Sequence, residues 1–365
     1  MNNIIKKPKK LNIGDKVAIV SLSSGLLGED DLKLQVDLGV RRLTYMGITP
    51  VFMPNATKGL AFIKDNPKER ANDLKEAFRD DEIKGIICAI GGDDTYKTIP
   101  YLMADNEFKD LVKNNPKIFI GFSDTTNNHL MFNKIGLVTY YGLNFLSDIC
   151  ELSPVMLPYT EKSYQQFLMN EDTTTIQSSP LWYENRTTYD VMQLGVPLTE
   201  HKETKGYEVL HGKGQIEGIF WGGCLDSLYD IYTSTRYKDQ RDVYEKYDLL
   251  PPQAFFKDKI LFLETSEEKP EPKLFEQMLE TLKNEGILEN VLAVMVGKPY
   301  DEVHYDAYKK ILKKVGKDLN LPIIYNVNVG HALPRAMLPL GLKGLIDFDK
   351  KTIEITEKLF EVEAE

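Results

Sequence analysis

The first half of the chain alternates short apolar runs with segments of helical periodicity, and this alternation restricts the possible folds most strongly. The apolar runs are nearly continuous and rich in Val and Ile, as expected for strands buried on both faces of a sheet. Strands that alternate with helices imply a parallel sheet covered by helices on both sides. The predicted strands are Lys16–Leu22, Ile48–Met53, Gly85–Ile90 and Lys117–Phe122, and the predicted helices are Asp31–Met46, Pro67–Asp80, Thr95–Met103 and Thr126–Lys134.

The regular alternation stops after about residue 150. The Thr- and Ser-rich segment Glu171–Thr199 has little periodicity and predicts a linker or surface excursion. Strand and helix signals return beyond it. They predict strands at Gly214–Phe220, Lys259–Glu264, Val291–Val296 and Pro322–Val329, helices at Glu271–Asn284 and Tyr305–Leu319, and a hairpin of Lys343–Asp347 with Thr352–Thr356. We therefore expect a Rossmann- or flavodoxin-like parallel-sheet α/β domain over 1–170, an excursion over 171–205 and a C-terminal mixed α/β domain over 206–365.

Length and charge narrow the possible classes of function. A chain of 365 residues is long enough for two domains with separate cores. The net charge of −10 disfavours general binding to nucleic acid or to anionic membranes. No apolar run approaches the ~20 residues that span a bilayer, and Met1–Lys10 leads into no signal-peptide core. Cys88, Cys150 and Cys224 form neither a disulfide framework nor a zinc spacing, so we expect a cytoplasmic protein.

A serine stands where the predicted strand Lys117–Phe122 passes into a helix. At such a tight turn the hydroxyl of Ser123 would project from the sheet, as in a nucleophile elbow. The pattern Gly121-x-Ser123 lacks the second glycine of the usual elbow. Ser123 could instead cap the following helix, with Asp124 favouring the helix dipole. The motif by itself leaves both interpretations open.

A serine nucleophile needs a base and a group that orients the base. Of the five histidines, His331 follows a predicted strand and Gly330, which would let it face a crevice, although a structural role is also open. His129 lies on the helix that leaves the serine, which carries its side chain away. Glu264 ends an apolar strand, and a buried carboxylate needs a partner. That partner could also be an Arg, a Lys or a helix N-terminus.

Paired glycines follow the strand Gly85–Ile90. Gly91 and Gly92 would let backbone N–H groups approach a ligand and serve as oxyanion donors. The same string resembles the phosphate loop of diacylglycerol/NAD kinase and phosphofructokinase-like enzymes, in which carboxylates hold magnesium, although those families usually have Gly where this chain has Asp94. No G-x-x-x-x-G-K-[ST] or G-x-G-x-x-G motif is present. A phosphotransferase and a non-catalytic two-domain ligand-binding protein are therefore the alternatives to a hydrolase.

Taken in order, these motifs resemble the LD-carboxypeptidase family of serine peptidases, which includes the microcin C self-immunity peptidases. The resemblance runs from Lys16 to Glu357, nearly the whole chain. Each motif is weak alone, but the order is specific. The motifs are Gly14–Val20, Ile90–Thr95, Gly121–Asp124, Gly218–Leu225, Leu263–Thr265 and Gly330–His331 with the hairpin after it.

The resemblance implies a role for each candidate residue. It implies Ser123 as nucleophile, His331 as general base and acid, and Glu264 as the group that orients His331. It also implies an oxyanion hole from the backbone N–H groups of Gly92 and Asp124. The N-terminal domain would carry the serine and the C-terminal domain the Glu–His pair. A homodimer is usual in the family, and neither a cofactor nor a metal is implied.

The double glycine also bears on the substrate. Gly91–Thr95 looks more like the microcin-immunity branch, which cleaves the amide between an aminoacyl group and a nucleotide-like moiety and stacks the base on an aromatic residue. Trp182 could provide that stacking or could anchor its loop. Asp93 and Trp221 are further candidates for substrate binding. Cys224 replaces an expected polar residue, which puts a direct substrate contact there in doubt. Murein tetrapeptides, aminoacyl-nucleotides and other dipeptide-like amides all remain open as substrates.

Overall fold

The computed structural model describes residues 5–169 and 174–361, and the chain divides into two compact units. The first unit comprises residues 1–171, 186–198 and 359–365. The second comprises residues 172–185 and 199–358. Residues 171–173, where the predicted excursion begins, lie outside the described ranges.

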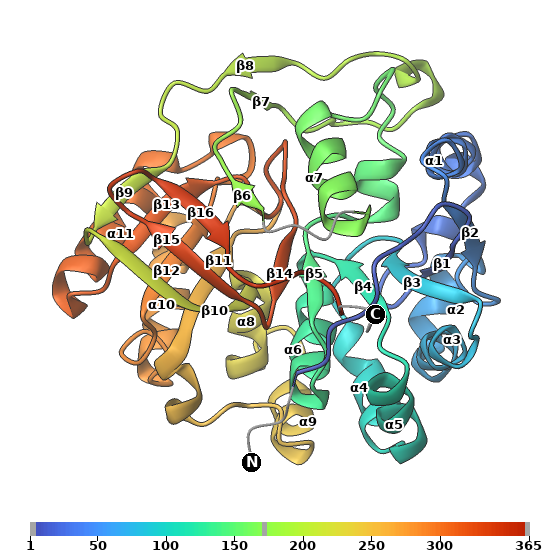
Figure 1. Cartoon of the computed structure of the whole chain (residues 1–365), viewed down its shortest axis with the longest axis horizontal. Helices are drawn as coiled ribbons and strands as arrows, with labels where there is room; N and C mark the ends of the chain where they lie inside the picture. Colours follow the sequence, from blue (N-terminus) through green and yellow to red (C-terminus); the bar gives the residue numbers. More distant parts are fainter. Residues whose placement is uncertain (1–4, 170–173, 362–365) are drawn as a thin grey trace. The chain divides into compact units, whose positions relative to one another are not determined.

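The N-terminal unit is built on a parallel sheet (Figure 1). The unit contributes five strands to this sheet, in the order β5-β4-β3-β1-β2, and every neighbouring pair among these five is parallel. Counted from β2, this is the flavodoxin-like strand order, in which ligands bind at the carboxyl ends of the strands. The predicted parallel-sheet domain is therefore confirmed. The strands are β1 (Lys16–Val20), β2 (Thr49–Phe52), β3 (Ile83–Cys88), β4 (Ile118–Gly121) and β5 (Thr139–Tyr141).

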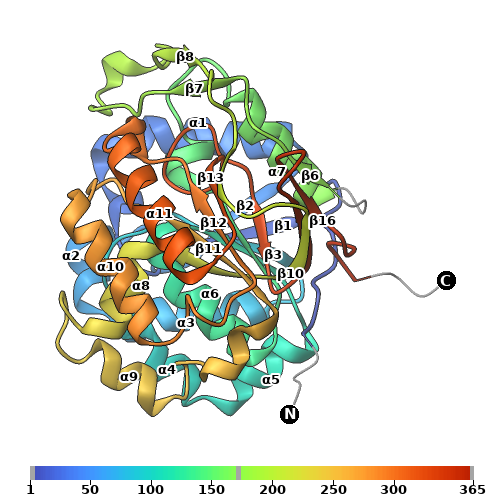
Figure 2. The ribbon, with the colours of Figure 1, turned by 90° about the vertical axis from the view of Figure 1, so that its left-hand side faces the viewer.

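Helices cover both faces of this sheet. Figures 1 and 2 show α1 and α3 on opposite sides of β1 and β2. In α3 the buried apolar residues Ala71, Leu74, Ala77 and Phe78 recur at helical spacing, so the apolar stripe faces the sheet. The helices are α1 (Lys33–Tyr45), α2 (Gly59–Asp65), α3 (Pro67–Arg79), α4 (Ile99–Met103), α5 (Asn106–Asn114), α6 (Thr126–Ile135) and α7 (Pro158–Met169).

The second unit contains an eight-stranded mixed sheet in the order β6-β16-β15-β10-β11-β12-β13-β9. The central strands β10 to β13 are parallel, and the outer strands join them antiparallel. The predicted mixed α/β architecture of the C-terminal part is thus confirmed. The strands are β6 (Thr175–Ile176), β9 (Glu208–His211), β10 (Gln215–Cys224), β11 (Lys259–Glu264), β12 (Ala293–Gly297), β13 (Ile323–Val327), β15 (Lys343–Asp347) and β16 (Thr352–Ile355), with β14 (Leu338–Leu340) before β15 in the chain.

Helices of the second unit pack in a row, with α10 in contact with both α8 and α11 (Figure 2). One face of α10 is apolar and buried, and it anchors this otherwise charged helix in the second unit. The residues of this face are Phe275, Met278, Leu279 and Leu282. The helices are α8 (Leu225–Thr233), α9 (Gln240–Lys246), α10 (Pro272–Asn284) and α11 (Tyr305–Leu319).

The predicted excursion contains a small antiparallel ribbon that the sequence pattern does not reveal. Strand β7 (Leu181–Tyr183) pairs with β8 (Glu200–Lys202), and Trp182 lies opposite His201. Strands of three residues are too short to show an alternating pattern, so the periodicity test cannot find them.

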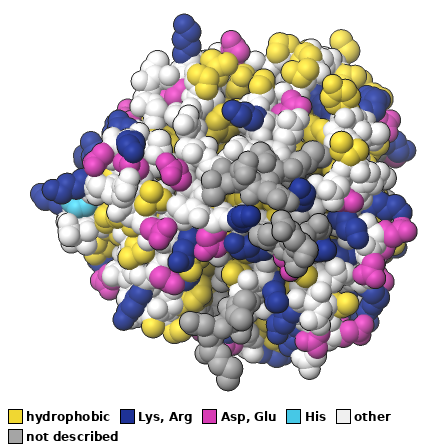
Figure 3. Space-filling model, viewed as in Figure 1, with side chains coloured by type: hydrophobic (Ala, Val, Ile, Leu, Met, Phe, Trp, Pro, Cys, Tyr) yellow, Lys and Arg dark blue, Asp and Glu magenta, His cyan; other side chains and the backbone are white. Residues whose placement is uncertain are grey.

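Charged side chains are mixed on the face shown in Figure 3. Lys and Arg are interspersed with Asp and Glu there, and no broad basic area of the kind that tracks a nucleic-acid backbone stands out. Within residues 5–169 and 174–361, no helix combines the length and the apolar character that crossing a bilayer requires.

Candidate active site

Ser123 occupies a strained turn between β4 and α6. It opens the helical turn η4 (Ser123–Thr125) with φ +67°, a left-handed conformation that residues other than glycine adopt rarely. The turn is tight, because a Cβ on Gly121 would lie 2.6 Å from Cγ2 of Thr125. Strain of this kind accumulates at functional sites and is the geometry of a nucleophile elbow.

The alternative role of Ser123 as a helix cap is wrong. The N-cap positions are Phe122 for η4 and Thr125 for α6, and the Ser123 side chain caps neither helix. Instead, the hydroxyl of Thr126 donates to the carbonyl of Ser123 at 2.7 Å, and the N–H of Ser123 donates to the hydroxyl of Tyr141 at 3.0 Å. Among the described residues no group forms a hydrogen bond with Oγ of Ser123, so this hydroxyl does not stabilise the turn through a hydrogen bond.

The double glycine lies against the serine. A Cβ on Gly91 would lie 2.8 Å from Cβ of Ser123 and 3.5 Å from the backbone nitrogen of Asp124, and one on Gly92 would lie 2.3 Å from Oγ of Ser23. Only glycine allows this approach. Over the described ranges of the chain, the backbone N–H groups of Gly92 and Asp124 donate no hydrogen bond. Both donors are thus available to a developing oxyanion.

The side chain of Asp124 ties together the loops that follow three neighbouring strands. Its carboxylate accepts hydrogen bonds from Oγ of Ser23 at 2.7 Å, from the N–H of Thr95 at 2.8 Å and from Nδ2 of Asn127 at 2.6 Å. Burial raises the pKa of Asp124, and the donors from Thr95 and Ser23 oppose that rise. The carboxylate therefore fixes the loops, while its backbone N–H stays open.

Asp94 is used structurally. Its Oδ1 lies 2.5 Å from Nη1 of Arg70 in a buried ion pair, and the same guanidinium nitrogen donates to the carbonyl of Leu22 at 3.0 Å. A buried charge needs such a partner. Asp93 beside it is exposed, and its role in substrate binding stays a prediction.

Glu264 and His331 meet in the second unit. Nδ1 of His331 lies 2.6 Å from Oε2 of Glu264, and the backbone N–H of His331 donates to the same oxygen at 3.0 Å. Both side chains are buried. Gly330 makes this possible through its φ of +107°, since a Cβ there would lie 2.5 Å from Cβ of Glu264. His331 is therefore a partner of the buried Glu264 carboxylate.

A second carboxylate, which sequence reasoning missed, contacts the other ring nitrogen of His331. Oε2 of Glu267 lies 3.0 Å from Nε2, although the Glu267 side chain is 61% exposed. Burial lowers the pKa of His331, but the two carboxylates outweigh it and raise that pKa to about 10. The hydrogen bond to His331 in turn lowers the pKa of Glu267 to about 2. An exposed Glu in a turn gives no sequence signal that would distinguish it from any surface carboxylate.

The Glu264–His331 pair has the chemistry of a general base. A carboxylate on Nδ1 holds the proton there and leaves the lone pair on Nε2. Glu264 is buried and fixed, whereas Glu267 is exposed and lies on the nitrogen that would accept a proton. His331 can therefore act as a base once the Glu267 carboxylate moves aside.

His129 has a structural role, in agreement with the prediction that its helix carries the side chain away from Ser123. Its Nδ1 lies 2.8 Å from Oγ1 of Thr139 and its Nε2 lies 3.0 Å from the carbonyl of Gly121, so it bridges β5 and β4. Burial lowers the pKa of His129 to about 4, and the ring stays neutral near pH 7.

The two tryptophans differ in their surroundings. Trp182 stacks on His201 with ring centroids 4.2 Å apart, and the Lys298 ammonium lies 5.2 Å from its ring centroid. Trp221 is 2% exposed and packs edge-on against Phe255 and Phe256 in the core of the second unit. Their roles in substrate binding stay predictions.

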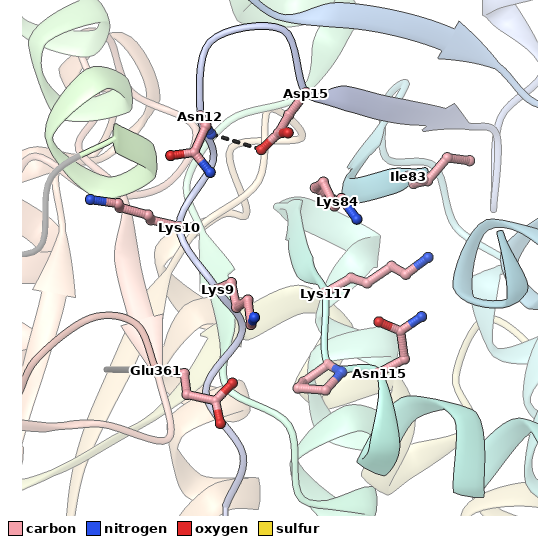
Figure 4. A pocket seen from close by; sticks show the side chains of 10 residues that line it. Lys9, Lys10, Asn12, Asp15, Ile83, Lys84, Asn115, Lys117 and Glu361 are labelled. Atoms are coloured by element: carbon pink, nitrogen blue, oxygen red, sulfur yellow. Dashed lines mark hydrogen bonds between the residues drawn. The ribbon is translucent and has the colours of Figure 1, made fainter. Parts of the chain in front are cut away.

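A cavity of about 390 Å³ opens in the N-terminal unit away from the serine (Figure 4). It lies at the amino ends of β1, β3 and β4, whereas Ser123 follows the carboxyl end of β4. Among its lining residues, Lys117 donates to the carbonyl of Ala77 at 2.8 Å, and burial lowers the pKa of Lys117 to about 8. This cavity is therefore not the site of the serine chemistry.

Comparison with known families gives two matches that together cover most of the chain. Residues 17–142 match the LD-carboxypeptidase N-terminal domain. Residues 217–346 match the LD-carboxypeptidase C-terminal domain. The first match includes Ser123 and the double glycine, and the second includes Glu264 and His331.

Individual relatives agree with this match. The chain is 30% identical to a probable murein peptide carboxypeptidase of Bacillus subtilis, over 96% of this chain and 94% of the relative. It is 28% identical to the microcin C7 self-immunity protein MccF of Escherichia coli, over 81% of this chain and 80% of the relative. Among solved structures, an MccF-like protein from Streptococcus pneumoniae in complex with AMP superposes with a TM-score of 0.90 at 47% identity, covering 93% of this chain and 98% of that one.

Proposed function

The chain belongs to the LD-carboxypeptidase family and is a serine hydrolase, and from that premise we propose that it hydrolyses an amide in an aminoacyl-nucleotide or a small peptide. We propose a triad of Ser123 as nucleophile, His331 as base and Glu264 as the residue that orients His331. The observation that carries this proposal is the left-handed Ser123, whose hydroxyl caps no helix.

The proposed reaction is acyl transfer to water. Oγ of Ser123 attacks the amide carbonyl while Nε2 of His331 takes its proton, which requires these two atoms to come within hydrogen-bonding distance. The N–H groups of Gly92 and Asp124 stabilise the oxyanion, an effect of about 2.7–4 kcal/mol for one donor in related chemistry. His331 then protonates the leaving amine. Water attacks the acyl-enzyme through the same base and frees the serine.

An aminoacyl-nucleotide is the substrate class that the relatives favour. The MccF-like structure at 47% identity holds AMP. MccF itself has been solved with aspartyl sulfamoyl adenosine and with glutamyl sulfamoyl guanosine. In this chain the ring of Trp182 already stacks on the flat ring of His201, which supports our proposal that the indole can stack on a base. A murein peptide ending in a D-amino acid is the second candidate, on the likeness to the Bacillus subtilis relative.

A hydrolysis panel tests the proposal. The full chain is incubated with an aminoacyl sulfamoyl adenosine and, separately, with a murein tetrapeptide, and the released amine is measured by mass spectrometry. The Ser123→Ala variant is the control for contaminating hydrolases. Cleavage of the nucleotide substrate alone identifies the first class, and cleavage of the tetrapeptide alone identifies the second. If the protein cleaves neither substrate, both proposed substrate classes are contradicted.

We also propose that the protein works as a cytoplasmic homodimer, as the family resemblance implies. Light scattering during gel filtration measures the assembly directly, and a mass near 41.7 kDa, that of one chain, would contradict the dimer.

A further inference from the structure

Cys224 extends the Glu264–His331 pair to a cluster of three side chains that can ligate a metal. One ligand atom of each residue lies within 4.8 Å of the others, and all three residues are buried. Cys224 and Glu264 are the last residues of the neighbouring parallel strands β10 and β11 and face each other in register. The loop after β13 brings in His331 through Gly330. The fold therefore gathers these ligands within one unit.

The three donors form a set that zinc prefers. A thiolate sulfur, an imidazole nitrogen and a carboxylate oxygen are the usual protein ligands of Zn²⁺, and three protein ligands with a fourth position open to water form a common type of site. With metal–ligand bonds of about 2.0–2.3 Å, neighbouring ligands of a tetrahedral ion lie about 3.3–3.8 Å apart. Side-chain rotations that shorten the longest separations, at most 4.8 Å, by about 1–1.5 Å would complete the site, and the 2.6 Å contact between Glu264 and His331 would open to admit the ion.

The charges around the cluster also favour a cation. Oδ2 of Asp226 lies 3.7 Å from Sγ of Cys224, and Oε2 of Glu267 lies 3.0 Å from Nε2 of His331. The Asp226 carboxylate is held in place by the hydroxyl and the N–H of Ser266. A dication balances one thiolate and one carboxylate without leaving an uncompensated buried charge.

We propose that Zn²⁺ binds Cys224, Glu264 and His331 and reversibly inhibits the hydrolase. Binding displaces the thiol proton of Cys224, and it also displaces the imidazolium proton where His331 is charged. If the ion takes Nε2, the lone pair of the base is consumed. If it takes Nδ1, the remaining proton stays on Nε2, which then donates instead of accepting. Either way His331 can no longer accept the proton of a serine hydroxyl.

Metal binding is independent of the proposed reaction, whereas the inhibition rests on it. Titration with cobalt measures metal binding without measuring activity. Tetrahedral Co²⁺ replaces Zn²⁺ in such sites, and a Co²⁺–thiolate bond gives a charge-transfer band. The metal-free full chain is titrated with Co²⁺ alone, under reducing conditions. We expect one Co²⁺ per chain with a thiolate charge-transfer band, and loss of the band when Zn²⁺ is added. Absence of a thiolate band in the wild type overturns the proposal, whatever the hydrolytic activity.

Cysteine variants locate the site. Cys224→Ser should lose the charge-transfer band and bind Co²⁺ at least tenfold more weakly, because it removes the sulfur ligand. Cys88→Ser and Cys150→Ser are matched controls, since both cysteines are buried in the other unit and should leave the titration unchanged. A band that persists in Cys224→Ser, or that disappears in Cys88→Ser, contradicts the assignment. Should Cys224→Ser not fold, Cys224→Ala takes its place, and the wild-type spectrum still decides.

The activity measurement then tests inhibition. In each protein the rate with Zn²⁺ is divided by the rate without it, so a change in basal activity does not matter. The Zn²⁺ concentration that halves wild-type activity should match the one that displaces Co²⁺, and it should rise at least tenfold in Cys224→Ser. A chain that binds Co²⁺ but hydrolyses neither substrate would refute the proposed function and leave the metal site standing. Wild-type activity that full Zn²⁺ occupancy leaves unchanged overturns the inhibitory role.

Discussion

Replacing Glu267 by Gln probes His331 at the nitrogen that would accept the serine proton. The change keeps the size and shape of the side chain and removes its negative charge. In the structure Oε2 of Glu267 lies 3.0 Å from Nε2 of His331, and the carboxylate favours the protonated ring. A base must be neutral, so activity falls as the pH drops below the pKa of His331. Removal of Glu267 lowers that pKa and moves the acid limb of the pH profile to lower pH.

The size of the shift follows from exposure. Ion pairs with an exposed partner contribute about 0.2–1 kcal/mol, and the Glu267 side chain is 61% exposed. Since one pKa unit corresponds to about 1.36 kcal/mol, the limb should move by about 0.15–0.7 pH units. Glu264 is fully buried on the other nitrogen, so Glu264→Gln should shift the limb by more and also lower the maximal rate through loss of the correct tautomer.

The assay is kcat/KM for amide hydrolysis as a function of pH, measured for the wild type and for the Glu267→Gln variant. Glu268→Gln is the matched control, because Glu268 pairs with Arg236 at 2.8 Å instead of with His331. A limb that stays in place or moves to higher pH in Glu267→Gln would refute the reasoning. An equal shift in Glu268→Gln would show that general surface charge, rather than the contact with Nε2, controls the base.

Three further perturbations test the N-terminal loops and the aromatic ribbon. Arg70→Ala removes the fully buried partner of the Asp94 carboxylate and leaves only the partly exposed Lys97, 3.1 Å from Oδ2, so urea unfolding should show a loss of about 3 kcal/mol, the lower end of the range for a broken buried pair. A loss below 1 kcal/mol would contradict the structural role of the Arg70–Asp94 pair. Gly91→Ala places a Cβ 2.8 Å from the Cβ of Ser123, and kcat should fall at least tenfold because the serine is displaced. An unchanged kcat would contradict the close approach of Gly91 to Ser123. Trp182→Ala removes a stacking face worth about 1–3 kcal/mol, so KM for a nucleotide substrate should rise about 5- to 150-fold while KM for a peptide stays constant. An equal rise for both substrates would exclude stacking.

The sequence was most informative where elements are long and buried. Strands such as β11 (Lys259–Glu264) and helices such as α11 (Tyr305–Leu319) occur at the predicted bounds because continuous apolar runs and helical spacing determine them. Glu264 and His331 were predicted separately, each from its place after a strand, and the structure brings them within 2.6 Å. Ser123 stayed ambiguous in the sequence, since only backbone geometry separates an elbow from a cap.

Other features could not be predicted because they depend on contacts between distant segments. Glu267 gains its importance from a histidine that follows a different strand, and in the sequence it is one exposed Glu among others. Cys224, Glu264 and His331 come from three separate strand ends, so no short metal-binding spacing exists to detect. The ribbon of β7 and β8 is not predictable from hydrophobic periodicity, because strands of only three residues show no alternating pattern.

Turnover by Ser123→Ala, measured beside the wild type on an aminoacyl sulfamoyl adenosine, tests the central claim most directly. The substitution removes one oxygen that no described residue holds by a hydrogen bond, so the fold should persist, as checked by an unchanged thermal midpoint. We expect kcat to fall at least 10³-fold, since the nucleophile is lost. Ser123→Ala that hydrolyses the substrate at a rate near that of the wild type would contradict the assignment of Ser123.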